Sequence, residues 1–413
     1  MVASTAVFDG KVQCMMVKNR LATRFALLGL GMTSVIVMVV GCADDGTQSA
    51  DSAVAPVEVD YQSNADGSND GAPAAAAVPS QPSVQPSIAP SPSQDPVVGV
   101  ADATSAPATP EPTPAPAAPA PMPAPAAEMP LDDNPPPSDI LRFVVLGDVG
   151  KANEGQVRVA EAIAGVCEAK ERCEFAVMLG DNIYDAGAVS ADDPVWVTHF
   201  EEPYAGLDMP FYATLGNHDY GAPSILEELG GGIGVERARG RAQVAYAASQ
   251  DKFRMPDEYY RFARGPVELV SLDTATMFWR DLDWAEATFD YVDVNEGQDN
   301  ILPQWSAQPL APWRIAFGHH PYLSNGRHGN AGNYDGVPEG LIGSGTALKE
   351  FFESHILGNF HVYMAGHEHL QQDLGEVDGT QLIVSGAGAS TTEIEWRNDY
   401  EWQSDALGFV LVE

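Results

Sequence analysis

Five short apolar segments of this sequence each lead into a glycine that is followed by side chains able to bind a metal ion. An apolar run of this length is typical of a buried strand, and a glycine after it permits a sharp turn. Carboxylate, imidazole, amide and phenol groups form a donor set that suits iron, zinc or manganese. One such motif is ordinarily a turn, but five in succession predict a metal site. The motifs are residues 147–150 (GDVG), 180–185 (GDNIYD), 216–219 (GNHD), 318–321 (GHHP) and 366–369 (GHEH).

The segments around these motifs predict an α/β fold. Strand-like runs alternate with helical patterns at residues 155–170, 194–204 and 346–357, and further strands follow late in the chain. This order predicts a largely buried sheet, whose ligands bind beyond the carboxyl ends of its strands. The predicted strands are residues 142–146, 175–179, 211–215, 267–272, 313–317, 361–364 and 381–385.

The five motifs resemble those of the metallophosphoesterase (calcineurin-like) superfamily, most closely the small tartrate-resistant purple acid phosphatases. Two departures from the general pattern point to that subgroup. Gly150 stands where most members have a histidine, and Tyr184 follows Asp181 by three residues. In purple acid phosphatases, a tyrosine at this place binds ferric iron. The resemblance covers most of residues 141–388 and implies a four-layer αββα sandwich, with two mixed β-sheets flanked by helices.

The resemblance also implies a centre of two metal ions. One ion, Fe3+, would be held by Asp148, Asp181, Tyr184 and His369. The second ion, Fe2+, Zn2+ or Mn2+, would be held by Asp181, Asn217, His319 and His367, with Asp181 bridging the pair. His218 would remain free as the general acid. The implied reaction is hydrolysis of small phosphate monoesters by attack of a metal-bound hydroxide.

Three further residues are candidates for substrate contact. His320 follows the ligand His319, and it either lines the substrate cleft or supports the ligands from behind. Arg327 and His328 lie in a polar, glycine-rich segment that borders the substrate in the family, or they belong to an ordinary surface loop. A separate basic cluster, Arg237, Arg239 and Arg241, is expected at the solvated surface.

Two other functions fit parts of the pattern. A phosphodiesterase or nucleotidase could use the same scaffold, because the ligand set does not fix the class of substrate. A surface ligand-binding lipoprotein with a vestigial metal site would have lost ligands, yet every ligand position and His218 are filled.

The N-terminal third predicts export. Basic residues precede an apolar run at residues 25–40 that ends in Val-Val-Gly-Cys, a secretory signal with a lipobox-like end at Cys42. A plain signal peptide or an N-terminal membrane anchor is the alternative. We expect three parts: a signal peptide at 1–42, a disordered, acidic, Pro/Ala-rich tether at 43–137, and a catalytic domain at 138–413. The expected location is outside the cytoplasm, either secreted or on a bacterial membrane through a lipid on Cys42.

The net charge and the cysteine content limit the kinds of ligand and the cellular compartment that we expect for this chain. The formal net charge of −37 argues against a nucleic-acid ligand, because a phosphate backbone needs a basic surface. Bound cations would instead supply the local positive charge that a phosphoester needs. Cys167 and Cys173 are close in sequence, and a local disulfide is the preferred interpretation in an oxidising compartment. The sequence predicts no oligomeric state.

Overall fold

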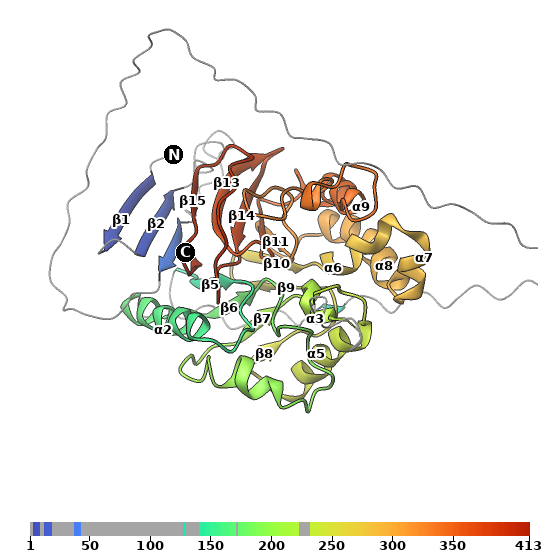
Figure 1. The fold of residues 1–413 in the computed structure, drawn as a ribbon. Helices are drawn as coiled ribbons and strands as arrows, with labels where there is room; N and C mark the ends of the chain where they lie inside the picture. Colours follow the sequence, from blue (N-terminus) through green and yellow to red (C-terminus); the bar gives the residue numbers. More distant parts are fainter. Residues whose placement is uncertain are drawn as a thin grey trace, which may run out of the picture. The chain divides into compact units, whose positions relative to one another are not determined.

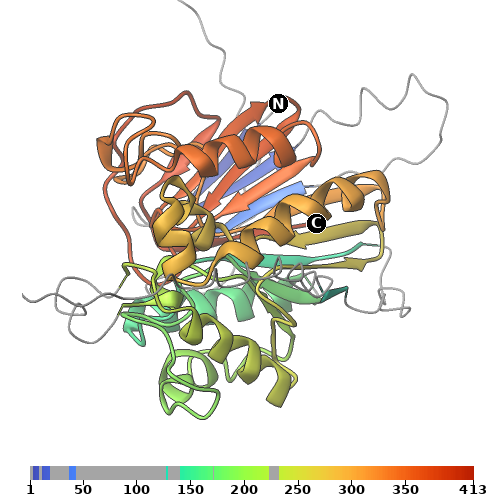
Figure 2. The same ribbon diagram turned by 90° about the vertical axis from the view of Figure 1, so that its right-hand side faces the viewer.

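The computed structural model describes residues 3–8, 12–18, 37–42, 127–128, 140–170, 172–222 and 232–413. Their core is a pair of eight-stranded sheets, with helices on the outer sides (Figures 1 and 2). Both sheets contain parallel and antiparallel strands. The predicted αββα sandwich with two mixed sheets is therefore confirmed.

The first sheet carries three of the five motifs. Its strand order is β1-β2-β3-β16-β5-β6-β7-β8, and β5 to β8 run parallel. Every residue of β5, β6 and β7 is buried, as expected for parallel strands covered on both faces. The bounds are β1 Ala3–Phe8, β2 Val12–Lys18, β3 Val37–Cys42, β5 Phe143–Leu146, β6 Phe175–Met178, β7 Phe211–Ala213, β8 Phe253–Arg254 and β16 Gly408–Val412.

The second sheet carries the other two motifs. Its strand order is β15-β13-β14-β12-β11-β10-β9-β4, with parallel pairing from β10 through β11 and β12 to β14. The sheets pack face to face, since Tyr212 of the first stacks on Phe262 of the second with ring centroids 4.0 Å apart. The bounds are β4 Ala127–Glu128, β9 Tyr260–Arg264, β10 Val267–Ser271, β11 Trp313–Phe317, β12 Val362–Ala365, β13 Gln371–Val377, β14 Thr380–Ser385 and β15 Trp402–Ser404.

The helices cover the two outer faces. The helix predicted at 194–204 is present over residues 195–201, where it ends in the short π-helix η1, and it stops before Pro203, which lacks an amide hydrogen. The helix predicted at 346–357 is present as α9 followed by the π-helical turn η4. The bounds are α2 Glu154–Ala169, η1 Val197–Glu201, α3 Asn217–Tyr220, α5 Arg237–Ser249, α6 Thr274–Met277, η2 Phe278–Asp281, α7 Asp283–Thr288, α8 Val292–Ala307, η3 Tyr334–Gly336, α9 Thr346–Phe351 and η4 Phe352–Ile356.

Two local predictions have clear outcomes. The disulfide between Cys167 and Cys173 is confirmed, and it ties the end of α2 to the segment before β6. The expected solvated position of the basic cluster is wrong for Arg237, whose guanidinium is buried 2.8 Å from Glu258. It is also wrong for Arg239, which donates to the Ala186 carbonyl at 2.8 Å. Arg241 is exposed as predicted.

The N-terminal third is described only in part. The predicted signal peptide contains β1 to β3, and β3 pairs antiparallel with β16. The predicted tether lies outside the described residues, except for β4, which pairs with β9. Removal of the signal peptide and lipidation of Cys42 stay predictions. Within the ranges described, we find no helix that is both long and apolar enough to cross a membrane.

Asp273 is expected to make the stability of the domain depend on pH. It lies after β10, caps α6 by accepting from the Thr276 amide, and accepts a hydrogen bond from the Tyr220 hydroxyl of α3. Burial raises the pKa of the Asp273 carboxyl to about 7, and the Tyr220 bond only partly offsets this. An unfolded aspartate titrates near pH 3.9, so the folded protein binds the extra proton between about pH 4 and pH 7.

Stability should therefore fall as pH rises through that window, and the loss should persist above it. Asp273→Asn removes this titration and should make the fall smaller; part of the fall remains, because burial also raises the pKa of Asp219 to about 7 and that of Asp373 to about 6. The check is the thermal midpoint of both proteins between pH 4 and 8. An equal fall in wild type and variant would show that Asp273 is not responsible.

Candidate metal centre

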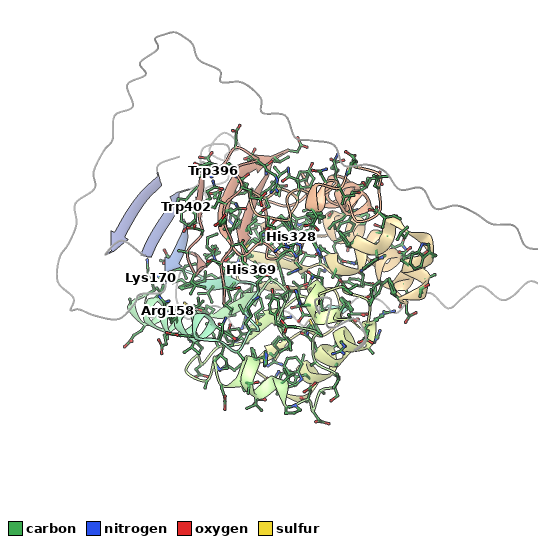
Figure 3. All side chains as sticks on the ribbon, in the orientation of Figure 1. Arg158, Lys170, His328, His369, Trp396 and Trp402 are labelled. Carbon is green, nitrogen blue, oxygen red and sulfur yellow. A yellow bond between two sulfur atoms is a disulfide. The ribbon has the colours of Figure 1, made fainter. Side chains whose placement is uncertain are left out.

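The polar motifs meet where their strands end. The carboxyl ends of five strands lie next to one another at one edge of the two sheets. These strands are β5, β6 and β7 of the first sheet and β11 and β12 of the second. Figure 3 marks His369 there, together with His328 from the loop after β11. All seven predicted ligands are brought together, and Asp148, Asp181 and His319 offer ligand atoms within 4.8 Å of one another.

The phenol of Tyr184 is the centre of the first group. Its oxygen lies 3.1 Å from Asp148 Oδ1, 2.7 Å from Asp181 Oδ2 and 3.1 Å from His369 Nε2. The outer nitrogen of His369, Nδ1, lies 3.0 Å from the Ser390 hydroxyl, which fixes the ring. Four potential ligand atoms from four residues thus face one point.

The amide oxygen of Asn217 is the centre of the second group. It lies 2.9 Å from His319 Nε2 and 3.1 Å from His367 Nδ1. Asp181 Oδ1 is 3.4 Å from His319 Nε2, so the two carboxylate oxygens of Asp181 serve different groups. This is the geometry that a bridging carboxylate needs.

Strained backbone holds several of these residues. Asp148, Asp181 and His367 adopt left-handed backbone angles with φ of 57°, 52° and 67°. Such angles cost roughly 1–3 kcal/mol each in residues other than glycine and are concentrated at functional sites. Gly216 lets the backbone approach Asp181, because any side chain at Gly216 would overlap the Asp181 carboxylate. The fold therefore gives up stability to direct these ligands inward.

The second group fits a cation because its lone pairs face one another. The Nδ1 atom of His319 lies 2.9 Å from the Leu179 carbonyl and must carry the hydrogen. In the neutral ring, Nε2 then presents a lone pair to Asn217 Oδ1, which is also an acceptor because the Asn217 amide group donates to Gly232. A cation between these atoms satisfies them all, so the donors present fit a metal ion.

The charges of the ligands depend on one another. Burial alone would lower the pKa of the His319 imidazole, but Asp181 and Asp148 outweigh it and raise that pKa, whereas a metal ion binds the neutral ring. Burial alone would raise the pKa of Asp181, but His319, His218 and the Tyr184 hydroxyl together lower it to about 2. Burial, with additional repulsion from other histidines, keeps the pKa of His367 well below its usual value, so its imidazole stays neutral. Burial and the two carboxylates raise the pKa of Tyr184 well above its usual value. The phenol therefore needs a strongly acidic cation to ionise.

Gly150 and Tyr184 depend on each other. The Tyr184 amide donates to the Gly150 carbonyl at 2.8 Å. A side chain at Gly150 would overlap the carbonyl group of Asn182, two residues before Tyr184. The position thus has no room for the histidine of the general superfamily pattern, because the chain that carries Tyr184 fills that space.

Gly150→Ala is expected to destabilise the protein by about 1–3 kcal/mol, since the new methyl group must push this chain aside. The check is thermal unfolding together with metal content, which should also fall. Gly165→Ala is the matched control, because nothing lies within 4 Å of that site on α2. A helical glycine replaced by alanine gains roughly 0.5–1 kcal/mol. Equal changes in thermal stability and metal content in Gly150→Ala and Gly165→Ala would refute the steric argument.

His218 lies beside the metal groups but outside them. Its Nδ1 is 2.6 Å from the Asp185 carbonyl, its amide donates to Asp181 Oδ1, and its ring lies 4.3 Å from that of Tyr184. Nε2 has no hydrogen-bond partner among the described residues. Asp219 fixes this turn, because its buried carboxylate accepts from the amides of Asn182, Ile183 and Gly216.

The three predicted substrate residues lie in different settings. His320 is buried, with Nδ1 3.2 Å from the Thr274 hydroxyl and its ring 4.6 Å from His367, so it supports that ligand from behind. His328 is partly exposed, and its ring lies 4.5 Å from His367. The side chain of Arg327 is exposed. Of the three, His328 and Arg327 have access to solvent.

The loop that contains Arg327 and His328 is held by contacts that the motifs did not predict. The buried carboxylate of Glu368 accepts from the Gly329 amide at 2.8 Å, and the Arg397 guanidinium donates to the carbonyls of Gly326 and Arg327. No local pattern marks Arg397, which is 70 residues away from Arg327 in the sequence. Lys151 was also missed, although it directly follows the first motif.

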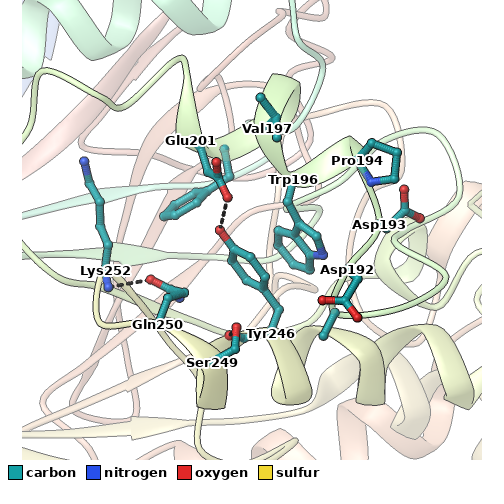
Figure 4. A pocket seen from close by; sticks show the side chains of 12 residues that line it. Asp192, Asp193, Pro194, Trp196, Val197, Glu201, Tyr246, Ser249, Gln250 and Lys252 are labelled. Carbon is teal, nitrogen blue, oxygen red and sulfur yellow. Dashed lines mark hydrogen bonds between the residues drawn. The ribbon is translucent and has the colours of Figure 1, made fainter.

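A separate cavity of about 520 Å³ lies beside η1 and α5 (Figure 4). Trp196 and Tyr246 stack in its wall with centroids 3.8 Å apart, and Tyr246 donates to Glu201. None of the predicted site residues lines it. The metal centre is therefore distinct from this cavity.

Two packed sheets with a buried carboxylate, imidazole and phenol cluster at their strand ends define a metal-dependent hydrolase. The chain belongs to the calcineurin-like phosphoesterase family, whose model matches residues 141–371. It is therefore a metal-dependent phosphoric ester hydrolase, and its relatives imply a centre of two metal ions.

Purple acid phosphatases are among its relatives. Purple acid phosphatase 4 of Arabidopsis thaliana is 26% identical over 305 residues, which are 67% of this chain and 78% of that protein. The tartrate-resistant acid phosphatase type 5 of Rattus norvegicus is 24% identical over 61% of this chain and 73% of its own. A solved purple acid phosphatase from yellow lupin seeds, PPD1, aligns with a TM-score of 0.47 and 20% identity over 68% of this chain and 50% of its own.

Proposed function

We propose that the chain is an exported dimetal acid phosphatase that hydrolyses small phosphate monoesters. The observation that carries this proposal is the convergence of seven ligand side chains in two groups joined by Asp181, with His218 left unligated at their edge. The purple acid phosphatase relatives support the monoester class.

The first group would hold Fe3+ through Asp148, Asp181, Tyr184 and His369. The second group would hold Fe2+, Zn2+ or Mn2+ through Asp181, Asn217, His319 and His367. When bound, such ions would lower the pKa of water and neutralise charge on the phosphoryl oxygens. Buried Tyr184 favours a trivalent ion, because its phenol resists ionisation without one.

His218 would supply the proton for the departing alcohol. The Asp185 carbonyl accepts from Nδ1, so in the protonated imidazolium form the transferable proton is the one on the other nitrogen, Nε2. His328 and Arg327 would contact the phosphoester from the side of His367. His320 would orient His367 and not touch the substrate.

Export would follow from the N-terminal segment, with Cys42 lipidated or the chain released after cleavage. The disulfide between Cys167 and Cys173 supports an oxidising compartment. Mass analysis of the mature N-terminus after expression in a bacterium is the test. A diacylated Cys42 at the N-terminus supports the lipid anchor. A protein that stays inside the cell and still begins at residue 1 contradicts export.

The substrate class is tested by comparing 4-nitrophenyl phosphate with bis(4-nitrophenyl) phosphate. The proposal predicts a kcat/KM for the monoester well above that for the diester. A strong preference for the diester would instead establish a phosphodiesterase on this scaffold. Loss of activity after removal of the metal ions, and recovery on their return, controls for a contaminating enzyme.

A further inference from the structure

Lys151 occupies a fixed position at the edge of the metal centre. It directly follows the first motif, and its amide donates to the Val149 carbonyl at 2.8 Å. The next residue, Ala152, has a left-handed φ of 48°, and Asn153 then caps α2. The backbone on both sides of Lys151 is therefore constrained.

The side chain of Lys151 reaches over Tyr184. Its ammonium nitrogen lies 3.9 Å from the centroid of the phenol ring, and the residue is only partly buried. Among the described residues, it has no hydrogen-bond or ion-pair partner. By contrast, Lys170 and Lys349 lie 3.3 and 3.0 Å from carboxylates. An unpaired ammonium is notable in a chain with 58 acidic and 21 basic residues.

The position of Lys151 relative to His218 indicates a role for its ammonium group in substrate binding. Tyr184 contacts both side chains, since the His218 ring also lies within 4.3 Å of it. If His218 protonates the departing alcohol, that alcohol leaves beside the His218 ring, and the Lys151 ammonium is a nearby cation because both side chains contact the same phenol ring. Arg327 and His328 belong to the loop beside His367, whereas the Lys151 ammonium lies beside the phenol ring that His218 contacts.

We propose that Lys151 is a specificity residue that binds a negatively charged group on the alcohol portion of the substrate. This inference rests on the proposed phosphatase function and narrows its substrate class. It favours phosphate monoesters whose alcohol carries a carboxylate or a second phosphate. Such a contact is electrostatic, partly exposed and therefore weakened by salt.

The test compares two substrates of equal shape, 4-carboxyphenyl phosphate and 4-carbamoylphenyl phosphate, which differ in the charge of the leaving group. Wild type should prefer the charged substrate by kcat/KM. Lys151→Met should lower the ratio of the two kcat/KM values by about fivefold, which is the upper range for an exposed ion pair. Lys151→Arg should retain most of the ratio, and added salt should lower the ratio in wild type and in Lys151→Arg but not in Lys151→Met.

Arg158→Met is the matched control, because it removes the same charge at a position on α2 that lies apart from His369 of the metal centre (Figure 3). Its ratio should equal that of wild type. Active Lys151→Met enzyme with an unchanged ratio, or an equal fall in Arg158→Met, overturns the assignment of Lys151 alone. Metal-loaded wild type that hydrolyses neither substrate overturns the phosphatase proposal and this inference with it. Thermal midpoints of all variants confirm that the folded state is being compared.

Discussion

Replacing His218 with alanine should lower kcat by about 10²–10⁴-fold, the usual range for loss of a general acid. The two metal groups should remain intact, because the His218 ring is not part of either one. Only its backbone amide contacts Asp181, and that amide is kept in the variant. The effect should be smallest for substrates whose leaving group is already a stable anion, since those need no proton.

The check is kcat measured alongside elemental analysis of the same preparation. His355→Ala is the control histidine, because it pairs with Asp299 near α9 and takes no part in the centre. It should keep wild-type activity. A His218→Ala protein with normal metal content and undiminished turnover of alkyl phosphates would remove His218 from the mechanism.

Tyr184→Phe should abolish visible absorption and weaken iron binding at the first group. The change deletes the one oxygen that lies within 3.1 Å of Asp148, Asp181 and His369, yet keeps the ring that contacts His218 and Lys151. Loss of an outer-shell partner costs 10–100-fold in metal affinity, so loss of a ligand should cost at least about that much. Activity should fall with the iron content.

Tyr322→Phe is the matched control, because its hydroxyl donates to the exposed Glu353 and not to a metal group. Its spectrum and metal content should equal those of wild type. If Tyr184→Phe retains iron, colour and activity, the phenol is not a ligand and the assignment of the first group fails.

Much of the fold could be predicted from local pattern. The strands that carry the motifs are continuous apolar runs, such as β5 and β6, and they are visible because parallel strands are buried on both faces. Elements that combine buried charge with apolar residues were missed. β9 contains Arg261, which is buried against Glu268, and α5 begins with the buried Arg237. Such charges look solvent-exposed in a sequence because their partners lie elsewhere.

In the metal centre, too, local sequence patterns could be predicted and contacts between distant segments could not. Each ligand motif could be found because a glycine and its donor side chains are adjacent in the sequence. The residues that orient the ligands, such as Ser390 beside His369 and Thr274 beside His320, are common residue types in separate segments. Only the folded chain brings them together. The steric reason for Gly150 likewise lies in the folded chain, because the backbone of Asn182 packs on it.

The central claim is a two-metal centre with Tyr184 bound to ferric iron. Elemental analysis of the purified protein, with a visible spectrum of the same sample, tests it most directly. We predict two metal ions per chain, at least one of them iron, and a purple or pink protein whose absorption arises from phenolate-to-iron charge transfer. A colourless oxidised protein with two divalent ions, or one that binds no metal, would contradict the claim.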